Sequence, residues 1–448
     1  MNITDFSLKL NGFPIQQALA DLRQIQNIPE ADFKSHVERQ KQEIVDFHLQ
    51  HNAFYQSLYK TGASWEDLPI LTKKNLQAPL TERLSKGYST KDVYVNKTSG
   101  STGDPFYFAK DKYTHALTWA VIQNRFNWHD LYGKKQARFY GIPKEKKARY
   151  KERLKDVFSN RFRFNVFDLS EKALDNWMVQ FQNTSYRYLN GYTTVIVAFA
   201  SHLAKKGMVL KEICPSLQAC VVTSEMCFES DKLLMEQAFG VPVINEYGAS
   251  ELDLIAFQDT NNQWILNKET LFIEVLDQEN RPLPYGETGK LVITSLYNKA
   301  HPFIRYEIGD VGAIEPLNNK QFILKSLQGR KEDLVKLPSG KVAPGLTFYY
   351  VTKSIMKDNG EVNEIKVIQT KLDAFEIHYS GKKELTETDQ QGITQALFDY
   401  LEPNLRVSFI KFDQLPRSKS GKLKQFASLL KSETLRQAQS DNNNAIKE

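Results

Sequence analysis

Six consecutive small or hydroxylated residues form the stretch of this chain whose residue types point most clearly to a chemical function. They are Thr98, Ser99, Gly100, Ser101, Thr102 and Gly103. Such residues add little to a hydrophobic core. The glycines allow backbone angles that other residues avoid, and hydroxyl and backbone N–H groups can form a concave anion-binding nest. An ordinary surface turn has the same composition. The hexapeptide alone therefore leaves phosphate binding and a plain turn equally open.

A second candidate is Tyr247-Gly248-Ala249-Ser250-Glu251, which follows a predicted strand. A carboxylate just beyond the C-terminal end of a strand faces the ligand crevice of an α/β sheet, and Mg²⁺ prefers oxygen ligands. Glu251 is therefore a candidate metal ligand. The alternative is a solvated glutamate in a strand-end turn, and the glycine-rich loop upstream favours the first interpretation.

Three further segments carry charged residues in order along the chain. Asp310 ends the segment Arg305–Asp310, and its carboxylate can accept hydrogen bonds from two neighbouring hydroxyl groups, although Gly309-Asp310 alone is simply a turn. Residues 329–333 read Gly-Arg-Lys-Glu-Asp, and residues 416–422 form a Lys/Ser/Gly loop that ends at Lys422. A charge run of this kind is usually solvated surface. Each segment alone therefore indicates no function, and only their occurrence together along one chain is informative.

The elements that must position these residues alternate between strands and helices from Ala137 onward. Apolar patterning predicts strands at 137–142, 187–189, 217–223 and 241–246, and helices at 36–60, 112–128, 145–158, 171–182, 193–205 and 229–239. This alternation predicts a mostly parallel sheet covered by helices. The Thr98–Gly103 loop follows a short predicted strand at 93–95, which is where α/β proteins hold phosphates.

Beyond residue 254 the pattern changes. Closely spaced strands with turn signals between 254 and 324 indicate a small antiparallel, barrel-like β subdomain. Further on, strands at 364–370, 374–379 and 407–412 and helices at 346–356 and 386–401 predict a small α+β module. We therefore predict an α/β protein with a large N-terminal domain over 1–330, a small mobile α+β C-terminal domain over 331–435 and a disordered polar tail over 436–448.

Length and composition fit a soluble protein of two domains. The 448 residues exceed the size at which single cores stop growing. Lys and Arg outnumber Asp and Glu by only 59 to 53, too little to imply nucleic-acid binding from the total. The first residues do not resemble a secretory leader, no apolar run is long enough to span a membrane, and three scattered cysteines suit a reducing compartment. We expect a cytoplasmic protein with no membrane-spanning segment and no nucleic-acid partner.

The ordered set of motifs resembles that of the adenylate-forming (acyl-CoA synthetase, ANL) superfamily, and within it the phenylacetate-CoA ligase-like branch. The resemblance extends from about Leu68 to Phe426 and also includes Thr223–Glu225 and the turn Lys336–Pro344. It implies a large nucleotide-binding domain and a small domain that rotates about the Glu332 region. Two positions depart from the usual pattern. Asp104 stands where many relatives carry lysine, and Glu332 stands where relatives commonly carry aspartate or lysine.

The resemblance also implies roles for individual residues. The catalytic group would be Lys422, Glu251 and Arg330, with Glu251 as the Mg²⁺ ligand and Glu332 as the hinge. The ATP site would be formed by Thr98, Ser99, Gly100, Ser101, Thr102, Gly103, Ser224, Glu225, Glu246, Tyr247, Gly248, Ser250, Asp310 and Arg330. The acid would bind near Tyr140, Gly141 and Gly248, beside the turn Asn190–Tyr192. Aromatic residues in the strand Arg138–Tyr140 hint at an aryl or medium-sized acid, although Phe and Tyr in strands are more often core.

The implied reaction is ATP-dependent activation of a carboxylic acid to an acyl-adenylate and transfer of the acyl group to a thiol, above all coenzyme A. The alternatives are acyl or aminoacyl transfer to a carrier protein, an amine or a hydroxyl, as in polysaccharide or pigment biosynthesis, and a non-catalytic nucleotide-binding relative. A homodimer is left open. The twelve Lys and Arg residues between Lys134 and Arg163 form either a solvated face or a surface for an anionic acceptor, the phosphates of coenzyme A or an acidic acyl-carrier protein.

Overall fold

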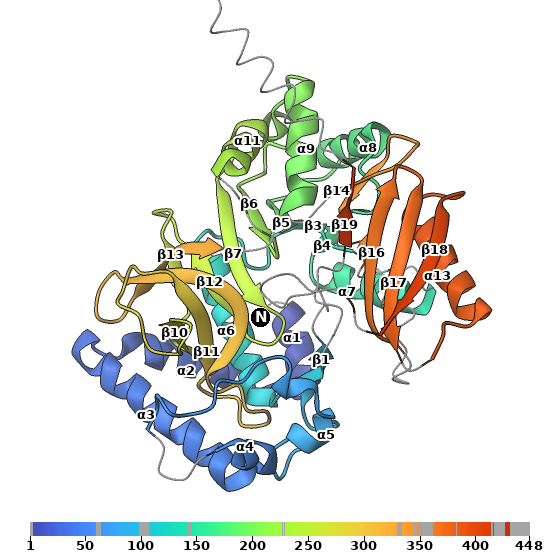
Figure 1. Cartoon of the computed structure of the whole chain (residues 1–448). Coiled ribbons are helices and arrows are strands. Elements are labelled where there is room, and N and C mark those ends of the chain that lie inside the picture. The colour runs from blue at the N-terminus through green and yellow to red at the C-terminus, as the bar shows by residue number, and fades with distance from the viewer. Residues whose placement is uncertain are drawn as a thin grey trace, which may run out of the picture. The chain divides into compact units, whose positions relative to one another are not determined.

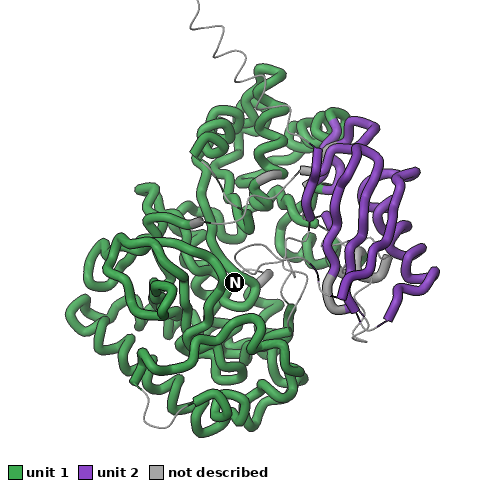
Figure 2. Tube along the Cα trace, in the orientation of Figure 1, with its two compact units in different colours: residues 1–99, 105–166, 171–331 green, residues 100–104, 167–170, 332–448 purple. Residues whose placement is uncertain are grey.

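The computed structural model describes residues 3–59, 64–97, 107–141, 146–225, 227, 229–328, 334–344, 347–348, 351, 362–381, 383–413, 415 and 426–430. Its contacts divide the chain into two compact units, with residues 1–99, 105–166 and 171–331 in the first and residues 100–104, 167–170 and 332–448 in the second (Figure 2). The existence of two domains that move independently, with a boundary after residue 330, stays a prediction. No helix in these described ranges is long and apolar enough to cross a membrane.

The first unit begins with four helices, α1 (Ile3–Leu10), α2 (Ile15–Asn27), α3 (Glu30–His51) and α4 (Ala53–Leu58). The prediction of one helix over 36–60 was wrong at Asn52. The buried Asn52 side chain accepts a hydrogen bond from the Tyr55 backbone N–H at 2.8 Å and caps α4. Its amide group donates to the Arg83 carbonyl at 2.9 Å, so the break between the helices is tied to the following segment.

An eleven-stranded sheet runs through the first unit in the order β10-β11-β12-β13-β9-β8-β7-β6-β5-β3-β4 (Figure 1). Every residue of β5 and β6 is buried, as expected for parallel strands covered on both faces. The predicted parallel strands are confirmed, with ends displaced by at most three residues. They are β3 (Gln136–Phe139), β5 (Tyr188–Tyr192), β6 (Ala219–Thr223) and β7 (Val243–Ala249). A further parallel strand that was not predicted, β4 (Arg161–Arg163), pairs with β3.

Helices of the first unit alternate with these strands. Their bounds are α6 (Lys112–Asn127), α7 (Lys146–Phe158), α8 (Glu171–Gln182), α9 (Thr193–Lys205), α10 (Leu210–Ile213) and α11 (Glu229–Phe239). Predicted bounds for α8, α9 and α11 are confirmed to the residue. An aromatic core joins them to the sheet, since Phe139 of β3 stacks on Phe164 with ring centroids 4.6 Å apart and also contacts Trp177 of α8.

The antiparallel part of the sheet contains β8 (Asp253–Gln258), β9 (Trp264–Leu266), β10 (Leu271–Leu276), β11 (Gly289–Ser295), β12 (Tyr306–Pro316) and β13 (Phe322–Gln328). The sequence assigned these strands to a barrel-like subdomain. Their antiparallel pairing is confirmed, but β7 pairs in parallel with β6 and antiparallel with β8. The β-rich part is therefore hydrogen-bonded into the same sheet as the parallel strands.

A separate hairpin, β1 (Tyr94–Lys97) and β2 (Tyr107–Lys110), lies on either side of the predicted phosphate loop in sequence. Lys97 is the partner of Tyr107 in the antiparallel register. A short 3₁₀ turn at Asn75–Gln77 and helix α5 (Leu80–Arg83) precede it. The buried Arg83 guanidinium donates to the Tyr107 carbonyl at 2.6 Å, which anchors β2 where it leaves the loop.

The second unit contains a four-stranded sheet in the order β18-β17-β16-β19. The strands are β16 (Val362–Lys371), β17 (Ala374–Gly381), β18 (Arg406–Phe412) and β19 (Phe426–Ser428). Helix α13 (Glu387–Tyr400) begins with a capping box between Thr386 and Asp389. A small hairpin is formed by β14 (Leu334–Lys336) and β15 (Val342–Pro344). Most of the helix predicted at 346–356 lies outside the described residues.

Candidate active site

Two tyrosine–carboxylate pairs meet where β7 ends and β12 begins. The Tyr247 hydroxyl donates to Asp310 Oδ2 at 2.8 Å, and the Tyr306 hydroxyl donates to Glu251 Oε1 at 2.8 Å. Tyr247 and Glu251 come from the end of β7 and the turn after it, whereas Tyr306 and Asp310 belong to β12. The structure thus brings together the two predicted motifs Tyr247–Glu251 and Arg305–Asp310, more than fifty residues apart in the sequence.

The protonation of the two tyrosines follows from their surroundings. Burial and the Asp310 carboxylate raise the pKa of Tyr247 well above its usual value, and burial and the Glu251 carboxylate do the same to the pKa of Tyr306. Both hydroxyls therefore keep their protons at neutral pH and act as donors. Each hydroxyl therefore fixes the orientation of the carboxylate that accepts its hydrogen bond.

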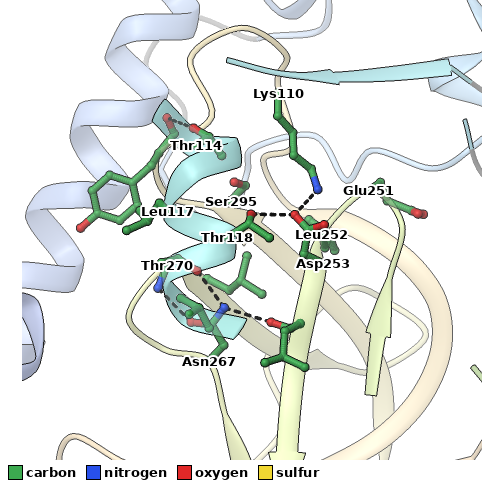
Figure 3. A pocket seen from close by; sticks show the side chains of 14 residues that line it. Lys110, Thr114, Leu117, Thr118, Glu251, Leu252, Asp253, Asn267, Thr270 and Ser295 are labelled. Carbon is green, nitrogen blue, oxygen red and sulfur yellow. Dashed lines mark hydrogen bonds and ion pairs between the residues drawn. The ribbon is translucent and has the colours of Figure 1, made fainter. Parts of the chain in front are cut away.

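The turn that carries Glu251 is held by a buried lysine. Lys110, the last residue of β2 and 2% exposed, forms an ion pair with Asp253 and donates to the Ser250 carbonyl at 3.2 Å (Figure 3). The Thr118 hydroxyl of α6 donates to the same Asp253 Oδ2 at 2.7 Å. Lys110 therefore ties β2, which follows residues 98–106 in the sequence, to the turn that carries Glu251. Lys110 belongs to no recognisable sequence motif and was not among the predicted site residues.

We expect Lys110→Met to destabilise the first unit. The methionine keeps the apolar stem but removes the cation. Of the two partners of the Asp253 carboxylate described above, the Thr118 hydroxyl then remains. The free energy of unfolding, measured by urea titration, should fall by about 2 kcal/mol, less than for a fully buried pair because the Asp253 side chain is 24% exposed. Lys112→Met, at an exposed lysine two residues later, is the matched control. Equal stability of both variants would show that Lys110 does not hold the turn.

A second cation beside Glu251 is Lys73, whose Nζ lies 3.9 Å from Glu251 Oε1. The backbone of Leu71 pairs with β12, since its N–H donates to the Arg305 carbonyl at 3.0 Å and its carbonyl accepts from the Glu307 N–H at 2.8 Å. This pairing carries Lys73 to the carboxylate. About a third of the Lys73 side chain is exposed, so it also faces solvent and any anionic ligand bound there. No sequence motif marked this residue.

The segment after β6 contains a residue with an unusual backbone conformation. Ser224 has φ of +71°, a left-handed conformation that is uncommon for a residue other than glycine. The Glu225 carbonyl accepts a hydrogen bond from the Thr193 hydroxyl at 3.2 Å, and the Glu246 side chain accepts one from Thr223 at 3.0 Å. Burial raises the pKa of Glu246, opposed by this hydrogen bond and by the charge of Arg138.

The residues predicted to hold the acid lie at the ends of β3, β5 and β7. The Tyr140 ring lies 4.9 Å from the Tyr192 ring, and the Arg138 guanidinium lies 4.0 Å from the Tyr140 centroid. Gly191 and Gly248 must be glycine, because a Cβ would stand 2.2 Å from the Phe139 carbonyl oxygen and 2.4 Å from that of Asp253, respectively.

Phe139 is fully buried and belongs to the aromatic core described above, so of the aromatic pair in the strand Arg138–Tyr140 only Tyr140 stands with the predicted acid-binding residues. Gly141 is buried, and its carbonyl accepts from Arg163 at 3.0 Å.

Other predicted site residues are placed differently or not at all. Ser250 is exposed at the turn before Glu251. The phosphate loop Thr98–Gly103, Arg330, Glu332 and Lys422 lie outside the described residues. The prediction that all cations of the basic segment form one face is wrong for Arg161 and Arg163, which bind Asp156 at 2.6 and 2.9 Å.

No family model matches this chain. It is 23% identical over 268 residues to a phenylacetate-coenzyme A ligase of Thermus thermophilus, a match that covers 52% of this chain and 58% of that protein. It is also 26% identical over 170 residues to a phenylacetate-coenzyme A ligase of Pseudomonas putida, covering 35% of this chain and 37% of that protein. The chain therefore matches less than two thirds of the length of either curated relative.

Solved structures of 2-hydroxyisobutyryl-CoA ligase have the same fold. The complex with 2-HIB-AMP and CoA in the thioesterification state gives a TM-score of 0.55 at 15% identity, covering 92% of this chain and 93% of the other. The postadenylation complex with 2-HIB-AMP gives 0.53 at 14% identity, covering 93% of each chain. At this level of identity the likeness establishes the fold alone, and the predicted α/β fold class is confirmed.

Proposed function

We propose that this chain, whose sequence resembles the phenylacetate-CoA ligases and whose fold is that of the adenylate-forming enzymes, activates a carboxylic acid in two steps. In the first, a carboxylate oxygen of the acid attacks the α-phosphorus of ATP, and pyrophosphate leaves. In the second, a thiolate attacks the acyl carbon, AMP leaves, and a thioester forms. The attacking carboxylate is already ionised at pH 7, so the first step needs no general base.

The observation that carries this proposal is the pairing of Tyr247 with Asp310 and of Tyr306 with Glu251 at adjoining strand ends. It offers two oriented carboxylates of different character in one place. Asp310 is suited to accept from the two ribose hydroxyls of a nucleotide. Glu251, beside the cation of Lys73, is suited to a polyphosphate and its counter-ion. A nucleoside triphosphate presents both groups.

The donor set fits Mg²⁺. A magnesium ion in a nucleotide site commonly takes one or two protein carboxylates and completes its octahedron with phosphate oxygens and water. Glu251 supplies one such carboxylate, and its side chain is only 4% exposed. When bound, the ion would neutralise charge on the phosphates. The protein residues then position the reactants: Tyr306 orients Glu251, Tyr247 orients Asp310, and Lys73 adds a positive charge beside Glu251.

Coenzyme A is the acceptor we propose, because the two curated relatives are named as coenzyme A ligases. ATP and coenzyme A are metabolites of the cytoplasm, which is where we propose the reaction occurs. A carrier protein, amine or hydroxyl acceptor requires the same first step and remains the alternative. A relative that only binds nucleotide would have no need for a carboxylate buried against a tyrosine hydroxyl and a lysine, and this arrangement supports catalysis.

We expect the purified chain to release pyrophosphate from ATP in the presence of Mg²⁺ and a suitable acid. The assay compares aryl and aliphatic acids of increasing size, with reactions lacking acid as the control. Coenzyme A, a phosphopantetheinylated carrier protein and simple amines are then added separately, and acyl products are identified by mass spectrometry. ATP binding without acid-dependent pyrophosphate release across the panel would instead support a non-catalytic nucleotide-binding protein.

A further inference from the structure

The outer face of α7 carries an unusual stripe of exposed apolar side chains. Tyr150 is 73% exposed, Leu154 46%, Val157 72% and Phe158 53%. Their spacing of four, seven and eight residues from Tyr150 places them on one side of the helix. Phe162 of β4, 36% exposed, follows shortly after the helix. Exposed apolar side chains grouped in this way mark an interaction site.

The opposite face of α7 is already occupied. Asp156, 2% exposed, accepts from Arg161 at 2.6 Å and from Arg163 at 2.9 Å, and Glu152 binds Arg163 at 3.0 Å. These contacts join the acidic face of the helix to β4. Because Arg161 and Arg163 of β4 hold the two acids, the helix cannot turn about its axis without breaking these contacts. The apolar stripe is therefore fixed on the outward side.

Lys and Arg positions flank the stripe. Of these, Lys155 also pairs with Glu152 at 2.7 Å, and the Arg153 guanidinium donates to the Arg163 carbonyl at 3.3 Å. The helix contains six Lys and Arg residues against its two acids, Glu152 and Asp156. At 100° per residue, the helical positions of Lys151 and Lys155 lie on one side of the stripe, and those of Lys146 and Arg153 lie on the other. The Arg153 guanidinium is 5.6 Å from the Phe162 ring. The pattern is an apolar strip with cationic positions along both margins.

We propose that this outer face of α7 binds an anionic membrane surface. A helix that rests on a lipid headgroup layer buries Phe, Leu and Tyr at the acyl boundary and directs Lys and Arg at both margins toward lipid phosphates. An anionic lipid surface can neutralise cations on both margins at once, because its phosphates are mobile and need no fixed positions. The cytoplasmic leaflet of a membrane is such a surface. A second copy of this chain fits poorly, because a symmetric contact would place two cationic margins against each other. This inference does not depend on the proposed reaction.

The test is co-sedimentation of the full chain with vesicles of phosphatidylcholine, with and without phosphatidylglycerol. The wild-type chain should bind the anionic vesicles and be released by added salt. The double variant Val157→Glu/Phe158→Glu should bind about tenfold more weakly. Val179→Glu on α8 and Leu233→Glu on α11 are matched controls, since those side chains are 48% and 49% exposed, and they should bind as the wild type does.

Three measurements keep the result interpretable. Circular dichroism and the melting temperature should be unchanged in the double variant, because both side chains are largely exposed. A second variant, Lys146→Glu/Lys151→Glu, reverses the charge of one position on each margin and should lose binding to anionic vesicles while keeping the stripe. The proposal is overturned if wild-type and double variant bind vesicles equally, if neither binds, if an acidic carrier protein binds the stripe while vesicles do not, or if the double variant converts a dimer to a monomer.

Discussion

Lys422→Ala should slow formation of the acyl-adenylate by about 10²- to 10³-fold, the usual cost of removing a preorganised charge that faces the transition state. The resemblance to adenylate-forming enzymes assigns Lys422 to the adenylation loop, where its cation would contact the acid carboxylate and the α-phosphate. In the second orientation of a mobile C-terminal domain it would be far from both. The reaction of supplied acyl-adenylate with thiol should therefore continue at nearly the wild-type rate.

The measurement separates the two half-reactions. Pyrophosphate release reports the first, and thioester formation from synthetic acyl-adenylate reports the second. Lys419→Ala is the matched control, because it removes a lysine from the same loop three residues earlier and should leave both rates close to wild type. If Lys422→Ala slows both half-reactions alike, the lysine has a structural role and the two-orientation mechanism loses its main support in this chain.

Glu251→Gln should lower the adenylation rate by about 10²-fold and raise the Mg²⁺ concentration needed for half-maximal activity. The amide has the same shape as the carboxylate, and its oxygen can still accept the hydrogen bond from the Tyr306 hydroxyl, now 2.8 Å away. The fold should therefore be preserved while the negative charge is lost. Titration of pyrophosphate release with Mg²⁺ at fixed ATP measures the effect.

A suitable control is Glu315→Gln on β12, the strand that carries Tyr306. Glu315 pairs with Lys325 at the surface, and an exposed pair of this kind contributes little, so the Mg²⁺ titration should not change. The melting temperature of Glu251→Gln must stay close to that of the wild type before its kinetics are interpreted. An unaltered rate at limiting Mg²⁺ would remove Glu251 from the metal site and leave it as the partner of Tyr306 alone.

Local patterns in the sequence predicted much of the secondary structure. The bounds of α8, α9 and α11 follow from apolar periodicity that ends at clear breaks. The single helix predicted over 36–60 failed at Asn52, because its decisive hydrogen bond to the Arg83 carbonyl joins residues 31 apart. A contact of that range leaves no trace in a periodic pattern, although asparagine is a common helix N-cap.

In the candidate site too, local motifs predicted some residues, whereas residues placed by long-range contacts were not predicted. Tyr247, Glu251 and Asp310 were found by motif, and the structure brings them together. Lys110 and Lys73 were not found, because a lone lysine is usually solvated and nothing in the local sequence indicates that it is buried or beside a carboxylate. Tyr306 lay inside a recognised motif, but its hydrogen bond to Glu251 joins residues 55 apart in the sequence, which no local pattern indicates.

The two tyrosine–carboxylate pairs also determine when the site can assemble during synthesis of the chain. Tyr306 follows its partner Glu251 by 55 residues, and Asp310 follows Tyr247 by 63. A ribosome adding 5–20 residues per second needs roughly 3–11 s to cover the shorter interval. During that time β7 and its turn exist without the strand that completes them. The nascent chain therefore displays the Glu251 turn before it can orient the carboxylate, and the site is assembled only when β12 has emerged.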